Sequence, residues 1–78
     1  MAFDVKSFLR EKSQEMDKEL SRQRSNTRTL EIVYWRVFKT WRKSLWWGSA
    51  EVCAELQSWL KFYFSRLKEK GAKVPFPK

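Results

Sequence analysis

The stretch that decides the fold is LEIVYWRVFKTWRKSLWWGSAEVCAELQSWL, residues 30–60. Its apolar residues recur every three or four positions on both sides of Gly48, which is the spacing of an amphipathic helix. We expect Gly48 to end the first helix as its C′ residue and Ser49 to cap the next one. A link this short permits only a tight antiparallel turn, so the sequence predicts a helical hairpin.

The first arm of the hairpin is predicted over residues 28–47. Seven of its apolar residues fall within an arc of about 140°, which makes a broad core face. They are Leu30, Val33, Tyr34, Val37, Phe38, Trp41 and Leu45. The opposite side carries a second stripe in place of the usual polar surface. This stripe consists of Trp35, Lys39, Arg42 and Trp46.

The second arm is predicted over residues 50–70, with one wide apolar face. Its members are Val52, Cys53, Leu56, Trp59, Leu60, Tyr63, Phe64 and Leu67. A further helix is predicted over residues 5–24, after Asp4 as N-cap, and its narrow apolar stripe suits packing along one side only. Ser25, Asn26 and Thr27 favour a turn before the first arm. The alternative is one continuous helix, because neither glycine nor proline forces a stop there.

The C-terminal residues 72–78 are predicted to be extended, because Pro75 and Pro77 disfavour helix in the residue before each of them. Two interpretations of this tail stay open. It folds back so that Val74 or Phe76 covers the core, or it is a short docking peptide for a partner.

The predicted fold class is all-α, a small three-helix protein with a single helical domain over residues 1–71. The chain of 78 residues has two glycines and two prolines, and none of them precedes Gly48. A β-protein needs far more turn residues than this. A core of this size is marginal, so self-association, for instance as a homodimer, or a partner could complete it.

The residue counts argue against an enzyme and against a metal site or cofactor. The chain has no histidine, the commonest general base and metal ligand, and only one cysteine, Cys53. Cys53 is expected to be a small core residue, and its lone thiol suits the cytoplasm or another reducing compartment. The N-terminus does not resemble a secretory signal, and the longest uncharged run, residues 44–50, is far too short to span a membrane.

Positive charge and indole side chains coincide in the middle of the chain. The formal net charge is +8, and residues 25–49 hold five basic groups, one acidic group and four of the five tryptophans. Lys and Arg neutralise phosphates, and indoles accept a stacked base or a guanidinium. The candidate partner-binding residues, which we call the cationic face, are Arg28, Trp35, Arg36, Lys39, Arg42, Lys43 and Trp46.

These residues favour a small basic binding protein whose partner is anionic, with nucleic acid ahead of an acidic protein. Bulky indoles in place of short polar side chains indicate stacking or shape contact more than readout of base edges. The alternative is a helical accessory or inhibitor protein that docks on a larger protein, since Trp and Arg are enriched at interfaces. A peripheral protein on an anionic membrane surface comes third, and burial of the stripe by the first helix or a second subunit is the purely structural interpretation.

Overall fold

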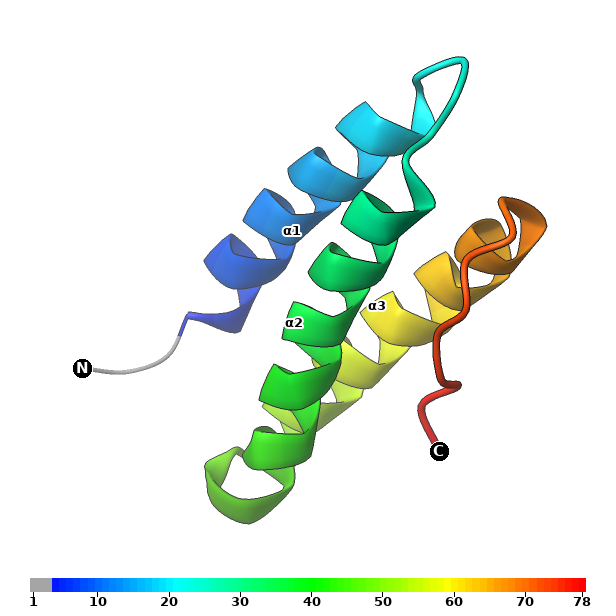
Figure 1. Cartoon of the computed structure of the whole chain (residues 1–78). Coiled ribbons are helices and arrows are strands. Elements are labelled where there is room, and N and C mark those ends of the chain that lie inside the picture. Colours follow the sequence, from blue (N-terminus) through cyan, green and yellow to red (C-terminus); the bar gives the residue numbers. More distant parts are fainter. Residues whose placement is uncertain (1–3) are drawn as a thin grey trace.

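The computed structural model describes residues 4–78 as three helices: α1 (Val5–Leu20), α2 (Thr27–Trp47) and α3 (Ala50–Glu69). α2 and α3 form an antiparallel hairpin, and α1 lies beside α2 (Figure 1). No strand occurs between residues 4 and 78. The protein is therefore the all-α three-helix fold that the sequence predicts.

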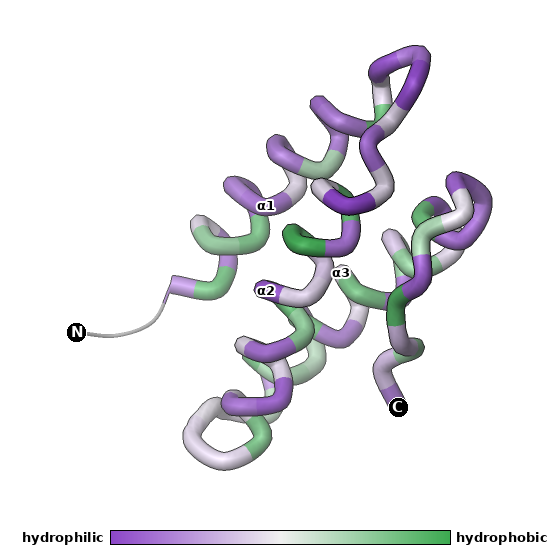
Figure 2. Tube along the Cα trace, viewed as in Figure 1, coloured by the Kyte–Doolittle hydropathy of each residue, from purple (hydrophilic) through white to green (hydrophobic). Residues whose placement is uncertain are grey.

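The core lies where the broad faces of α2 and α3 meet, and the stripe of α1 closes one side of it. The side chains with no exposed surface include Met16, Leu30, Tyr34, Val37, Leu56, Leu60 and Leu67. Hydrophilic residues dominate α1 and the turn after it, whereas hydrophobic residues recur along α2 and α3 (Figure 2). The narrow stripe of α1 thus packs on a core that the hairpin supplies.

The last turn of α2 departs from the predicted core. Leu45 was expected inside but is 59% exposed, and the small polar Ser44 is buried in its place. The Ser44 hydroxyl donates to the carbonyl of Trp41 at 2.6 Å, and the Cys53 thiol donates to the Ser44 carbonyl at 3.2 Å. The start of α3 therefore approaches α2 from the side of Ser44, and this approach leaves Leu45 outside.

Gly48 ends α2, but not as the left-handed C′ residue that the sequence suggests. Its backbone is extended, with φ −85° and ψ 162°. A Cβ atom at Gly48 would lie 2.8 Å from the carbonyl oxygen of Ser44, closer than such atoms approach. The turn therefore requires a residue without a side chain at position 48. The glycine with a left-handed backbone is Gly71, after α3, with φ 83°.

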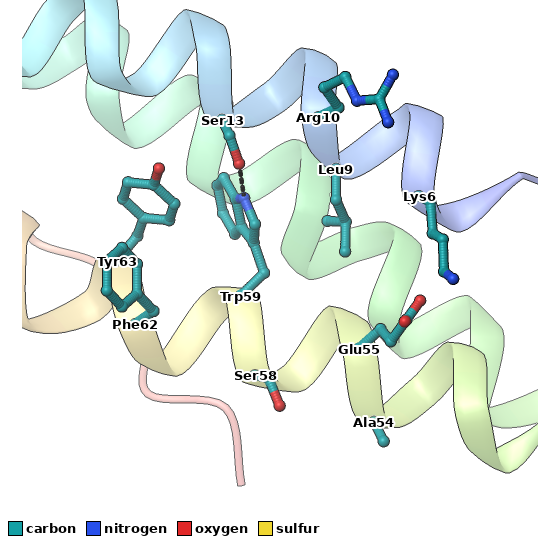
Figure 3. A pocket seen from close by; sticks show the side chains of 10 residues that line it. All are labelled: Lys6, Leu9, Arg10, Ser13, Ala54, Glu55, Ser58, Trp59, Phe62 and Tyr63. Atoms are coloured by element: carbon teal, nitrogen blue, oxygen red, sulfur yellow. Dashed lines mark hydrogen bonds between the residues drawn. The ribbon is translucent and has the colours of Figure 1, made fainter.

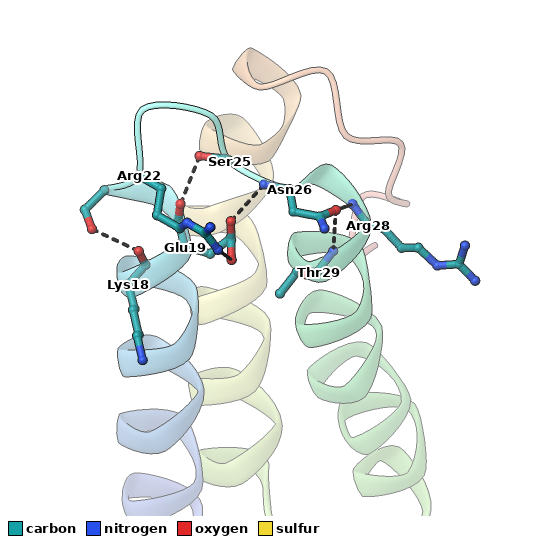
Figure 4. A network of polar contacts seen from close by, with 8 residues as sticks. Lys18, Glu19, Arg22, Ser25, Asn26, Arg28 and Thr29 are labelled. Carbon is teal, nitrogen blue, oxygen red and sulfur yellow. Dashed lines mark hydrogen bonds and ion pairs between the residues drawn. The ribbon is translucent and has the colours of Figure 1, made fainter.

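α1 ends at Leu20, short of the predicted end near Arg24, because Glu19 organises a turn (Figure 4). The Glu19 carboxylate accepts the backbone N–H of Asn26 at 2.8 Å, and its carbonyl accepts the Ser25 hydroxyl at 3.0 Å. These bonds turn the chain back over the end of α1. The alternative of one continuous helix is therefore wrong.

Asn26 is the residue that starts α2. Its side-chain oxygen accepts the backbone N–H groups of Arg28 and Thr29 at 3.0 and 3.4 Å, the role of an N-cap (Figure 4). α2 consequently begins at Thr27, one residue before the predicted start, and α3 ends one residue before its predicted end.

The C-terminal tail folds back onto the hairpin, which is the first of the two interpretations. The Phe76 ring packs edge-on against Phe64 with 5.0 Å between centroids, and Pro77 is buried. The Tyr34 hydroxyl donates to the Pro75 carbonyl at 2.6 Å. The tail therefore covers the side of the hairpin that α1 leaves open.

None of the helices between residues 4 and 78 combines the length and the apolar composition needed to cross a membrane.

Candidate functional site

The structure places all seven residues of the cationic face on the exposed side of α2. The opposite side of this helix is taken by α3, α1 and the tail, so helical geometry turns the seven outward. Trp46 is 91% exposed and Trp35 is 41% exposed. The indoles are therefore not sealed inside the monomer.

The two indoles differ in how firmly they are held. Trp35 contacts the buried ring of Phe38 edge-on, with 5.3 Å between centroids, and this contact holds one edge of the indole. Trp46 lies in the last turn of α2, one residue before its end, and projects almost entirely into solvent. Trp35 thus offers an oriented ring, and Trp46 offers nearly its whole surface.

The cations of α2 have no carboxylate partner among residues 4–78. The ion pairs in this part of the chain join Lys12 to Glu11 and Glu15, and Arg22 to Glu19, all on α1 or its following turn. Glu31 is the single acidic residue of α2, and its carboxylate accepts the backbone N–H of Lys73 at 3.0 Å. The positive charge of α2 is consequently not neutralised locally.

Among the helices, the net charge is concentrated on α2. α1 carries four basic and four acidic residues, and α3 carries three of each, whereas α2 carries five basic and one acidic. The tail adds cations beside this helix: Lys73 shares a hollow with Trp35, and Lys78 shares one with Arg42. Sequence reasoning missed both lysines, because a tail without helical periodicity gives no sign of where it lies.

The end of α2 exposes three consecutive large apolar side chains. Leu45, Trp46 and Trp47 are 59, 91 and 54% exposed, and only Trp46 was predicted as a site residue. Successive side chains of a helix point about 100° apart, so the three surround the end of the helix and do not share one face. This apolar apex, defined as Leu45–Trp47, continues the cationic face to the tip of the hairpin.

Residues 4–78 offer no evident metal centre, since no three His, Cys, Asp or Glu side chains gather within them. Cys53 is half-buried and its sulfur lies 3.3 Å from the Ser44 hydroxyl, a contact that joins the hairpin arms.

No family model, curated protein or solved structure matches this chain.

A further hollow, which the sequence did not predict, lies between α1 and α3. It is a groove of about 700 Å³ with Leu9, Trp59 and Phe62 among its lining residues (Figure 3). Across it the Trp59 indole N–H donates to the Ser13 hydroxyl at 2.8 Å. Close to it the Tyr63 hydroxyl donates to Asp17 at 2.7 Å. These two bonds fasten α1 to α3, and the lining is mostly apolar.

Proposed function

We propose that this protein is a small non-enzymatic binding protein that engages nucleic acid through the cationic face. One observation supports this most: five cations without an ion pair among residues 4–78 share an exposed helix side with Trp35 and Trp46. Lys and Arg that neutralise phosphates release condensed counterions, which drives binding.

The spacing along α2 suits a chain of phosphates with stacked bases. Trp35 and Trp46 are eleven residues apart, about 16 Å along the helix axis. Lys39 and Arg42 lie between them on the same exposed side. A strand along α2 would place its phosphates on these cations and its bases against the two indoles, since stacking accepts any base.

Tryptophan fluorescence titration with oligonucleotides, single-stranded and duplex, at several salt concentrations tests this function. If all five cations of α2 meet phosphates of a single strand, the logarithm of the binding constant falls with the logarithm of salt with a slope of about −3.5. The absence of binding even at low salt would overturn the proposal. Vesicles containing anionic lipid, titrated in parallel, report a preference for membrane surfaces.

A matched pair of double variants tests the location of the site. Lys39→Gln with Arg42→Gln removes two charges from the cationic face, and the slope is expected to become shallower by about 1.4. The control variant, Lys18→Gln with Lys61→Gln, removes two exposed charges from α1 and α3. It therefore lowers the net charge by the same amount as the first double variant. Equal loss of binding in both variants would show that net charge, and not this face, determines affinity.

The apolar apex supports a second candidate function, docking on a larger protein. Exposed indoles beside arginine are typical anchors at protein interfaces. A docking protein is expected to lose its partner on Leu45→Ser with Trp47→Ser and to tolerate the Lys39/Arg42 double variant. A nucleic-acid-binding protein is expected to show the larger loss with the Lys39/Arg42 double variant.

A further inference from the structure

The side of α3 that faces away from α2 carries an exposed phenylalanine in line with small side chains. Phe62 is 56% exposed. Ser58 and Ala54 lie one and two turns before it, both exposed, and all three border the groove between α1 and α3. This side therefore offers a projecting ring and, next to it, a hollow.

Charge is divided along the same helix. Glu51 and Glu55 lie in the first half of α3, whereas Lys61, Arg66 and Lys68 lie in the second half, followed by Glu69. None of them belongs to an ion pair among residues 4–78. The first half is thus net negative and the second half net positive, so an antiparallel copy of the helix would present the opposite charge at each end.

We propose that a second copy of this chain docks on this face, with α3 antiparallel to its counterpart about a two-fold axis at Ser58. Phe62 follows Ser58 by four residues and Ala54 precedes it by four, so this pairing sets each Phe62 beside the other copy's Ala54. Packed helices insert a side chain into a hole formed by four residues of the facing helix. Glu51, Ala54, Glu55 and Ser58 have the spacing of such a hole, and two of them are small enough to admit a ring.

Arg66 adds an electrostatic reason for this register. Its guanidinium stands over the Phe62 ring, 4.6 Å from the centroid. When Phe62 enters the hole of the other copy, Arg66 arrives beside the carboxylates of Glu51 and Glu55 that flank the hole. Two-fold symmetry repeats this contact, so each copy donates one arginine and receives one.

The distribution of charge favours a second copy on this face. α1 and α3 each carry equal numbers of acidic and basic residues, so copies do not repel there, whereas two cationic faces would. The groove beside Phe62 is lined by residues of α1 and α3 and by none of the cationic face, so that face of α2 lies outside the proposed contact. The dimer would then carry two such faces, and it forms whether or not they bind nucleic acid.

Light scattering coupled to size exclusion, together with sedimentation equilibrium on the full chain, tests the proposal. Unchanged protein is expected to approach twice the 9.5 kDa mass of the chain as concentration rises. Ser58→Arg fills the hole and should return the mass to 9.5 kDa. Gln23→Arg adds the same charge at an exposed position in the turn before α2, and it should leave the dimer intact.

A charge exchange identifies the partner as another copy. Arg66→Glu alone, and Glu51→Lys with Glu55→Lys, should each give monomers that circular dichroism shows to be helical. Mixing the two should restore a dimer, because every altered contact again joins opposite charges. A monomer at all concentrations, a dimer unaffected by Ser58→Arg, or a mixture that stays monomeric would overturn the proposal.

Discussion

The Tyr34 hydroxyl, on α2, donates a 2.6 Å hydrogen bond to the backbone carbonyl of Pro75, 41 residues later in the chain. A buried side chain of the hairpin thereby holds the tail, and Pro77 beyond it is fully buried. The Gln57 amide donates to the Pro77 carbonyl at 3.5 Å, so α3 contributes as well. The tail is consequently part of the core and positions Lys73 and Lys78 beside α2.

Tyr34→Phe should loosen the tail while the helices remain folded. It removes the hydrogen bond to Pro75 and keeps the ring, so the free energy of unfolding should fall by about 1 kcal/mol. Urea denaturation measures this loss, and hydrogen exchange should show faster exchange at residues 73–78. Tyr63→Phe is the control, because that hydroxyl bonds to Asp17 on α1. Equal tail exchange in both variants would contradict the role of Tyr34.

Alkaline pH should destabilise the protein through its two tyrosines. Burial raises the pKa of Tyr34 above its ordinary value of 10.0. Burial, followed by the hydrogen bond to Asp17, raises the pKa of Tyr63. The unfolded chain releases these protons at lower pH than the folded chain does, so the stabilisation is complete below the unfolded pKa and is lost as pH rises through the folded one.

Urea unfolding between about pH 9 and pH 11 measures this loss, with absorbance at the tyrosinate band recorded alongside. Tyr34→Phe should flatten the decline, because it removes one of the two groups. A decline of the same steepness in that variant would show that Tyr34 does not contribute to the loss of stability.

Periodicity predicted the buried side of α2 correctly from Leu30 to Trp41, because each of those residues obeys the 100° step of a straight helix. The prediction failed at Leu45, because the position where α3 begins determines which side of the last turn of α2 is buried. The early end of α1 escaped prediction for a similar reason. Nothing in the helical pattern of α1 reveals that the Glu19 carboxylate accepts a hydrogen bond from the backbone N–H of Asn26, after the helix has ended.

In the candidate site, too, the features set by a single helix were predictable and those set by contacts between segments were not. Exposure of Trp35 and Trp46 followed from their position opposite the core, which is a local property of one helix. The lysines of the tail and the groove beside Phe62 depend on how separate segments meet, and a periodic pattern carries no information about that.

Asn26→Ala should destabilise α2 from its first turn. The side chain satisfies two backbone N–H groups that otherwise lack partners, so its loss should cost about 1 kcal/mol. Asn26→Asp keeps the acceptor and should retain most of this stability. Chemical denaturation of the three proteins measures the difference, and equal stability of the alanine and aspartate variants would show that the cap contributes nothing.

Trp41 and Trp46, five residues apart on α2, form a matched pair that separates folding from binding. Trp41 is buried against Phe38, with 5.4 Å between ring centroids, so Trp41→Ala should cost about 3–5 kcal/mol of stability. Trp46→Ala removes an indole that is almost wholly in solvent and should change stability by less than about 0.5 kcal/mol.

The binding of the Trp46→Ala variant to single-stranded oligonucleotide should nevertheless weaken about tenfold, because base stacking contributes about 1–3 kcal/mol. Thermal unfolding and titration of the same samples provide both numbers. If Trp46→Ala binds as tightly as the unchanged protein, the Trp46 indole does not contact the nucleic acid, and its place in the proposed site is wrong.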